Sequence, residues 1–142
     1  MSLPLLKPEL YRRDGTLEYP DVPALLGGRC LRCGYVFFPL QRYGCEQCGA
    51  PADALHPHAL SGRGTLDARA PVHLHSRPGR QAPFAIVAVH LHDGPHVRTL
   101  LGAGTTAGAV APGVPMVATL EEVAVPGSEP AATALDLRFV PA

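Results

Sequence analysis

All four cysteines of the chain fall within residues 28–50, and their spacing suits metal binding. They form two C-x-x-C pairs separated by eleven residues: Cys30, Cys33, Cys45 and Cys48. Each C-x-x-C turn brings two thiolates close enough to bind one ion, and two such turns complete the tetrahedral sulfur site that Zn²⁺ favours. Because four thiolates leave no open position on the metal, we expect one structural zinc ion per chain rather than a catalytic one.

A glycine follows each cysteine pair, at Gly34 and Gly49. The chain must turn tightly there, with φ > 0, so that backbone N–H groups can point at the sulfurs.

One alternative to a zinc site is a pair of disulfides, and another is an iron ion in the same ligand set. The repeated spacing, the repeated glycines and the absence of a secretory signal favour a metal over disulfides. Sequence separates zinc from iron poorly.

Aromatic and basic residues accompany the cysteines. Residues 35–38 are expected to form a short strand closed by Pro39, so that one of the two phenylalanines faces the ribbon core and the other faces out. An exposed aromatic beside arginines suits contact with a partner protein, or with the adenine and phosphates of CoA. The alternative is that both rings only cover a ribbon too small for a core of its own. The candidate contact residues are Arg29, Arg32, Phe37, Phe38 and Arg42.

Histidines recur mainly as alternating pairs: His56/His58, His73/His75 and His90/His92, with His96 in addition. Residues i and i+2 share one face of a strand, so each pair is a conceivable metal ligand set. No acidic residue at matching spacing accompanies them. We therefore interpret the histidines as polar outward positions on half-buried strands.

Two further sequence patterns do not meet the requirements of a functional site. Residues 102–107 fit G-x-G-x-x-A, but that fingerprint needs a following helix, and Pro112 and Pro115 leave room for two turns at most. Glu121 and Glu122 are adjacent, so in a strand they face opposite sides and cannot act as a carboxylate pair. With every thiol assigned to metal and no G-x-S-x-G elbow, we predict no active site in this chain.

Composition limits the class of protein. The chain has 142 residues, of which 46% are hydrophobic, so we expect a small module plus one compact domain rather than disorder. Twelve basic and twelve acidic residues give zero net charge, so no basic excess attracts nucleic acid.

The N-terminus does not have the pattern of a signal peptide, and no apolar run approaches the roughly 20 residues of a membrane span. We expect a cytoplasmic protein.

The pattern along the chain predicts a mainly β fold in three parts. Residues 1–27 are a proline-broken N-terminal arm, with a short helix over 22–26 as one option, and residues 28–52 are a rubredoxin-like zinc ribbon. Residues 55–142 are predicted to form a five-stranded OB-fold barrel, because a long connection follows the third of five strands. A turn is expected at 76–80. The predicted strands are 62–75, 84–91, 96–101, 114–123 and 135–140.

Four stretches of the chain resemble the acyl-CoA-associated zinc-ribbon/OB-fold family, long catalogued as domain of unknown function thirty-five. They are GRCLRCGYVFFPLQRYGCEQCGA, LSGRGTLDARAPVH, PFAIVAVHLHDGPHVRTLLGAG and APGVPMVATLEEV, and they lie between residues 28 and 123. Family members are small partner subunits of thiolases, aldolases and MaoC-like hydratases. The small subunit of benzoylsuccinyl-CoA thiolase is similar in size and layout. The chain departs from the family pattern at Glu46, where proline is common.

The resemblance implies a non-catalytic accessory subunit of an acyl-CoA-processing complex, of thiolase or retro-aldolase type. Such a subunit would stabilise its catalytic partner in a hetero-oligomer and help to bind the CoA ester, with no role for nucleic acid or membrane. A nucleic-acid-binding module is the alternative, but it requires a basic groove with stacking aromatics, and only Phe84 and Phe139 lie in the barrel strands. A small redox protein with iron in the ribbon is the third hypothesis.

Overall fold

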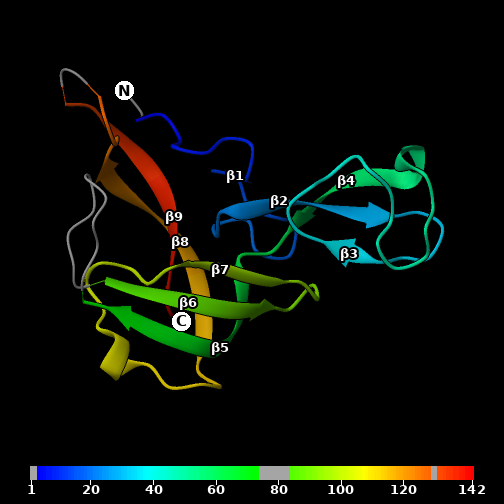
Figure 1. Ribbon diagram of the computed structural model, residues 1–142. Coiled ribbons are helices and arrows are strands. Elements are labelled where there is room, and N and C mark those ends of the chain that lie inside the picture. The colour runs from blue at the N-terminus through cyan, green and yellow to red at the C-terminus, as the bar shows by residue number, and fades with distance from the viewer. Residues whose placement is uncertain (1–2, 74–83, 129–130) are drawn as a thin grey trace.

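The computed structural model describes residues 3–73, 84–128 and 131–142, and short strands dominate it. Figure 1 shows two bodies, a small ribbon module carried by β2, β3 and β4 and a larger barrel built from the later strands. The elements in chain order are β1 (Tyr11–Arg12), β2 (Ala24–Cys30), β3 (Val36–Phe37), η1 (Ala52–Ala54), β4 (Leu55–Leu60), β5 (Arg63–Val72), β6 (Phe84–Leu91), β7 (His96–Leu100), η2 (Ala107–Ala109), β8 (Pro115–Ala124) and β9 (Thr133–Pro141).

Strand β2 is the centre of the N-terminal sheet. It pairs with β1 at its start and with β3 at its end, and its other edge is paired with β4 from Leu25↔Leu60 to Cys30↔Leu55. The helix considered over residues 22–26 is therefore wrong. Ala24 and Leu25 are buried, and pairing on both edges of β2 satisfies the backbone in an extended conformation. Residues 55–60, which were predicted to belong to the barrel, pair instead with the ribbon strand β2.

The second sheet is the predicted five-stranded barrel. Its order is β7-β6-β5-β8-β9, every pair is antiparallel, and a parallel bridge between Leu101 and Phe139 brings β7 against β9. This nearly closed order is that of an OB-type barrel, and the long connection between β7 and β8 lies where it was expected. Strand β6 has the predicted bounds. The predicted turn at 76–80 lies outside the described residues.

The barrel interior is aliphatic with one central ring. Phe139 is fully buried, and Leu66, Val87, Val89 and Met116 pack around it. The N-terminal arm joins this core, because Tyr11 and Leu25 belong to the same cluster and Leu5 forms a parallel bridge with Leu135. The arm is thereby tied to the last strand, as Figure 1 shows.

The ribbon is held against the barrel by packing and by one polar junction. Phe38 and Val36 pack against the barrel core from the ribbon side. Between β4 and β5, the backbone N–H of Ser61 donates to Asp93 Oδ1 at 3.1 Å and its hydroxyl donates to the same oxygen at 2.5 Å. Asp93 belongs to the β6–β7 hairpin turn, so this contact fixes where the hairpin meets the ribbon. No helix in the described ranges is long and apolar enough to cross a bilayer.

Candidate metal centre and its surroundings

The four cysteine sulfurs come together at the far end of the ribbon. All four lie within 4.8 Å of one another, with Cys30 Sγ 3.7 Å from Cys48 Sγ and Cys33 Sγ 3.6 Å from Cys45 Sγ. A tetrahedron with Zn–S bonds of about 2.3 Å has sulfur–sulfur edges of about 3.8 Å. A disulfide would need about 2.05 Å. The thiols are free, and their arrangement fits a metal ion bound between the two knuckles.

The two knuckles have the same backbone design. The Gly34 N–H donates to the Cys30 carbonyl at 2.8 Å, and the Gly49 N–H donates to the Cys45 carbonyl at 2.9 Å. Both glycines have the expected positive φ, 81° at Gly34 and 77° at Gly49. This left-handed conformation is open to glycine at little cost, which explains why a glycine follows each pair.

Backbone hydrogen bonds lower the pKa of two of the four cysteine thiols. The Cys48 N–H donates to Cys45 Sγ at 3.4 Å, and backbone hydrogen bonds, led by this one, lower the pKa of Cys45 to about 7. A hydrogen bond from the backbone of Cys33 is the main cause that lowers the pKa of Cys30. Both shifts favour the thiolate, which is the form that binds metal, whereas burial and hydrogen bonds with the other cysteine sulfurs raise the pKa of Cys48 to about 12.

The structure separates the candidate contact residues of the ribbon. Arg29, Arg32 and Arg42 are exposed. Phe37 is only 4% exposed and belongs to the ribbon core, and Phe38 is half-buried against the barrel core. One ring therefore faces the ribbon core as expected, but the other packs against the barrel and is not exposed. The second ring covers the junction between the two bodies, which the sequence pattern could not reveal.

Two other apolar side chains are exposed on the ribbon instead. Leu31 is 64% exposed between two metal ligands, and Tyr43 is 94% exposed next to Arg42. Neither residue was among the predicted contact residues. The signal in the sequence is their position in the two loops of the ribbon, where side chains are usually exposed.

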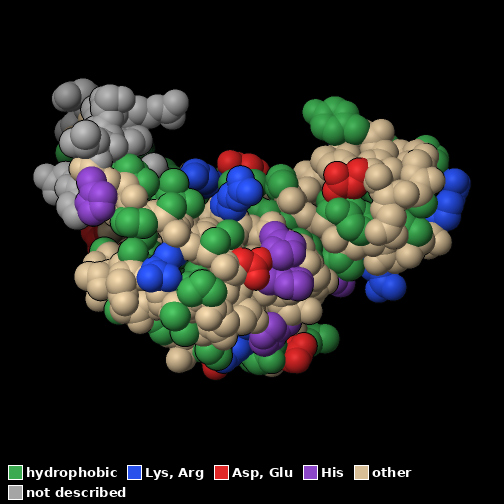
Figure 2. Space-filling model, turned by 60° about the horizontal axis from the view of Figure 1, so that its bottom comes forward, with side chains coloured by type: hydrophobic (Ala, Val, Ile, Leu, Met, Phe, Trp, Pro, Cys, Tyr) green, Lys and Arg blue, Asp and Glu red, His purple; other side chains and the backbone are tan. Residues whose placement is uncertain are grey.

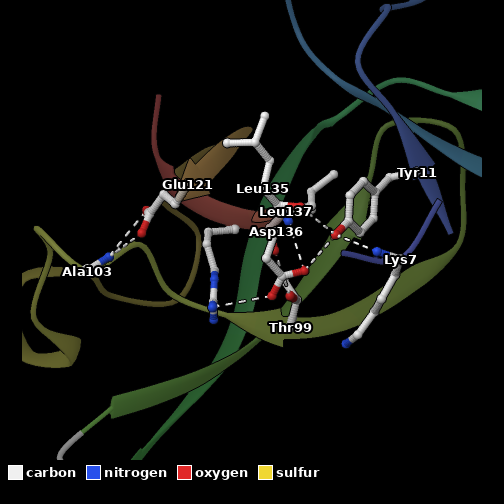
Figure 3. A network of polar contacts seen from close by, with 9 residues as sticks. Lys7, Tyr11, Thr99, Ala103, Glu121, Leu135, Asp136 and Leu137 are labelled. Carbon is white, nitrogen blue, oxygen red and sulfur yellow. Dashed lines mark hydrogen bonds and ion pairs between the residues drawn. The ribbon is translucent and has the colours of Figure 1, made fainter. Parts of the chain in front are cut away.

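A buried polar network joins the arm to the last strand (Figure 3). The Tyr11 hydroxyl donates to Asp136 Oδ1 at 2.8 Å and accepts from the Lys7 N–H at 3.1 Å. Arg138 Nη2 lies 3.3 Å from Asp136 Oδ2, which places the guanidinium against the same carboxylate. Burial, and then the hydrogen bond to Asp136, raise the pKa of Tyr11 to about 12. Nothing in the sequence pattern indicated this network, because Tyr11 and Asp136 are 125 residues apart in the chain.

The glycine-rich connection does not form a dinucleotide site in the described structure. One 3-10 turn, Ala107–Ala109, stands where the fingerprint requires a helix. The Glu121 carboxylate instead accepts the Ala103 N–H at 3.1 Å and 3.3 Å, as Figure 3 shows. This carboxylate therefore anchors the connection to β8.

Histidines and an acid meet on the outer face of the barrel. Asp67, His90 and His96 come from three adjacent strands, and their ligand atoms lie within 4.8 Å of one another. No acidic partner for the histidines is visible within any single strand of the sequence. The partner is supplied by β5, across the sheet.

Comparisons with known proteins agree with this geometry. Residues 18–54 match the family described as ChsH2, rubredoxin-like zinc ribbon domain. A solved structure described as "Ltp2-ChsH2(DUF35) aldolase" matches with a TM-score of 0.61 and 22% sequence identity, over 83% of this chain and 84% of that chain. A comparison with curated proteins found no match. These findings confirm the resemblance seen in the sequence: residues 18–54 match the ChsH2-type zinc ribbon, and the chain is similar in fold to a chain of that aldolase structure.

Proposed function

We propose that this chain is a non-catalytic accessory subunit of an acyl-CoA-processing complex of retro-aldolase or thiolase type. The observation that carries the proposal is the shared fold: the match to the chain in the structure described as an aldolase covers 83% of this chain and 84% of that chain. The ChsH2-type ribbon supports it independently, because that match rests on sequence. The structural zinc would hold the ribbon in shape and take no part in the chemistry.

Several potentially reactive side chains are engaged in structural contacts. This supports the proposal that a partner subunit performs the reaction. Among the residues described, the four thiols gather in the metal centre, where they are not free to act as nucleophiles. Asp136 is engaged by Tyr11 and Arg138, and Glu121 holds the backbone of the glycine-rich connection. We therefore place the nucleophile and the general base on a thiolase-like, aldolase or hydratase catalytic subunit.

The ribbon offers a surface for a partner or for the CoA ester. Arg32 and Arg42 are exposed, and the fully accessible ring of Tyr43 stands beside Arg42. Exposed tyrosine and arginine are the side chains that most often anchor protein interfaces. Arginine also binds phosphate through paired hydrogen bonds, and an aromatic ring can stack on adenine. In Figure 1 the ribbon projects away from the barrel, which leaves this surface open to a large partner.

The features of the barrel do not favour nucleic-acid binding. A single-strand binder uses exposed rings as stacking platforms in a basic groove. Phe139 is fully buried here, Phe84 is half-buried at the start of β6, and the net charge of the chain is zero. These features favour the accessory subunit over the nucleic-acid-binding module.

The test is to tag the chain in its native host and identify what co-purifies with it. We expect a stoichiometric subunit with a thiolase-like, aldolase or hydratase fold. We also expect turnover of an acyl-CoA by the complex and none by the isolated chain. Robust turnover by the verified pure chain would contradict the proposal. Purification as a free protein that binds single-stranded DNA with a salt-dependent affinity would favour the nucleic-acid module instead.

A further inference from the structure

The strand register places two histidines directly opposite each other on the outer face of the barrel. His90 of β6 and His96 of β7 are Cα partners in the antiparallel pair. Both side chains are exposed, and their rings are stacked with centroids 4.2 Å apart and an interplanar angle of 15°. Cross-strand partners on one face are close side-chain neighbours in a sheet. The register of β6 and β7 therefore places the two histidine side chains next to each other.

A β-bulge brings a carboxylate to the same place. On β5, Leu66 pairs with Val89 and Ala68 pairs with Ala88, so Asp67 is the extra residue between two ladder positions. Leu66 is buried in the barrel core, whereas Asp67 is exposed. Bulges of this kind re-aim a side chain, and here Asp67 Oδ2 lies 2.6 Å from His96 Nδ1. Three strands thus contribute one ligand atom each.

We propose that Asp67, His90 and His96 form a second metal site, which binds a divalent transition metal ion such as Zn²⁺, Co²⁺ or Ni²⁺. Two imidazoles and one carboxylate are a donor set that these ions accept, and the three ligand atoms already lie within 4.8 Å of one another. To bind zinc, the two stacked rings would have to turn so that their nitrogens converge on the ion at bond lengths of about 2.0–2.2 Å. Unlike the cysteine centre, this site has only three protein ligands and keeps open coordination positions.

The surroundings keep the site accessible. Histidine side chains gather beside an acidic one on this face, near the ribbon (Figure 2). His96 also lines two neighbouring hollows between barrel and ribbon, one with Phe38, Pro39 and Arg98 and the other with Tyr35 and Glu46. The remaining positions of the ion are therefore free for water or for a side chain from a docked protein. The inference stands on the three side chains alone and does not depend on the proposed accessory function.

The competing interpretation is an exposed ion pair between Asp67 and His96 with a stacked neighbour. Exposed pairs of this kind contribute little to stability and need no metal. A metal-binding measurement distinguishes the two interpretations, because a simple ion pair that is not a metal site would not bind an added metal ion.

The experiment titrates Zn²⁺ into full-length protein whose ribbon is already loaded, by equilibrium dialysis with elemental analysis. We expect a second bound equivalent in the wild type. We expect it to be lost in Asp67→Asn, His90→Gln and His96→Gln. His56→Gln is the matched control, because His56 is an exposed strand histidine outside the cluster, and this variant should keep the second equivalent.

A second measurement locates the ion. Co²⁺ or Cu²⁺ added to the zinc-loaded protein should broaden NMR signals around residues 67, 90 and 96 in the wild type and not in the three variants. Unchanged spectra elsewhere would show that the variants fold, as expected for exposed side chains. The proposal is wrong if the wild type stops at one equivalent, or if the second equivalent persists in all three variants.

Discussion

Gly27 of the central ribbon strand lies directly against the backbone of Phe37: a Cβ at position 27 would stand 2.4 Å from the Phe37 carbonyl oxygen. The same Cβ would come within 2.7 Å of Leu60 Cδ1 on the other side. No side chain fits between β3 and β4 here. The glycine is therefore required by the pairing of three strands and not by a turn.

We expect Gly27→Ala to destabilise the zinc-loaded protein by about 1–3 kcal/mol, because the neighbouring strand must shift to admit the methyl group. Chemical denaturation monitored by circular dichroism measures this. Gly104→Ala is the control, since a Cβ at Gly104 would meet no atom within 4 Å. Equal stabilities for the two variants would mean that the ribbon sheet accommodates the methyl freely.

Cys45→Ser should remove the metal and unfold the ribbon. A structural zinc ion contributes its binding free energy to folding, and a hydroxyl is a poor replacement for a thiolate ligand. Elemental analysis should show one zinc in the wild type and a large loss in the variant, and NMR should show collapse of the ribbon signals. Arg42→Ala changes an exposed residue between the two cysteine pairs and should keep the zinc. Freshly purified wild type without zinc or iron would contradict the assignment.

The contribution of Tyr11 to stability should disappear in strong alkali. Its pKa is raised from 10.0 to about 12 by burial and by the bond to Asp136, so the unfolded chain loses the phenol proton first. The stabilisation is therefore complete below pH 10 and is lost as the pH rises towards 12. Urea unfolding of wild type and Tyr11→Phe at a series of pH values tests this.

The two proteins should differ by about 1 kcal/mol below pH 10, where Tyr11→Phe loses the hydrogen bond to Asp136, and should converge above it. The exposed Tyr43 provides the control, because Tyr43→Phe should follow the wild-type curve at every pH. A constant difference between wild type and Tyr11→Phe across the alkaline range would show that Tyr11 titrates normally.

Arg32→Ala and Arg42→Ala test the surface of the ribbon. Neither side chain is a metal ligand and both are exposed, so zinc content and folding should be unchanged. We expect weaker association with the catalytic partner or a higher KM of the complex for its acyl-CoA. Arg69→Ala, at an exposed position of the barrel strand β5, is the matched control. If both ribbon variants assemble and turn over like the wild type, the contacts come from the barrel or the arm.

The sequence by itself determined the features that depend on neighbours along the chain. The spacing of Cys30, Cys33, Cys45 and Cys48 and the glycines after each pair were sufficient for the ribbon, because a knuckle is built from a few consecutive residues. Apolar and β-branched composition, alternation and turn residues were sufficient to predict strands close to β6, β8 and β9, because these are local properties of the chain.

Tertiary structure decided whatever depends on contacts between distant segments. Leu55–Leu60 has a strand pattern that would suit either sheet, and only the open edge of β2 settles that it pairs there. Phe37 and Phe38 look alike in sequence, yet one fills the ribbon and the other covers the junction with the barrel. The bond from Tyr11 to Asp136 and the cluster of Asp67, His90 and His96 arise from strand register and a bulge. Register is set by how whole strands pack together, which no single stretch of sequence records.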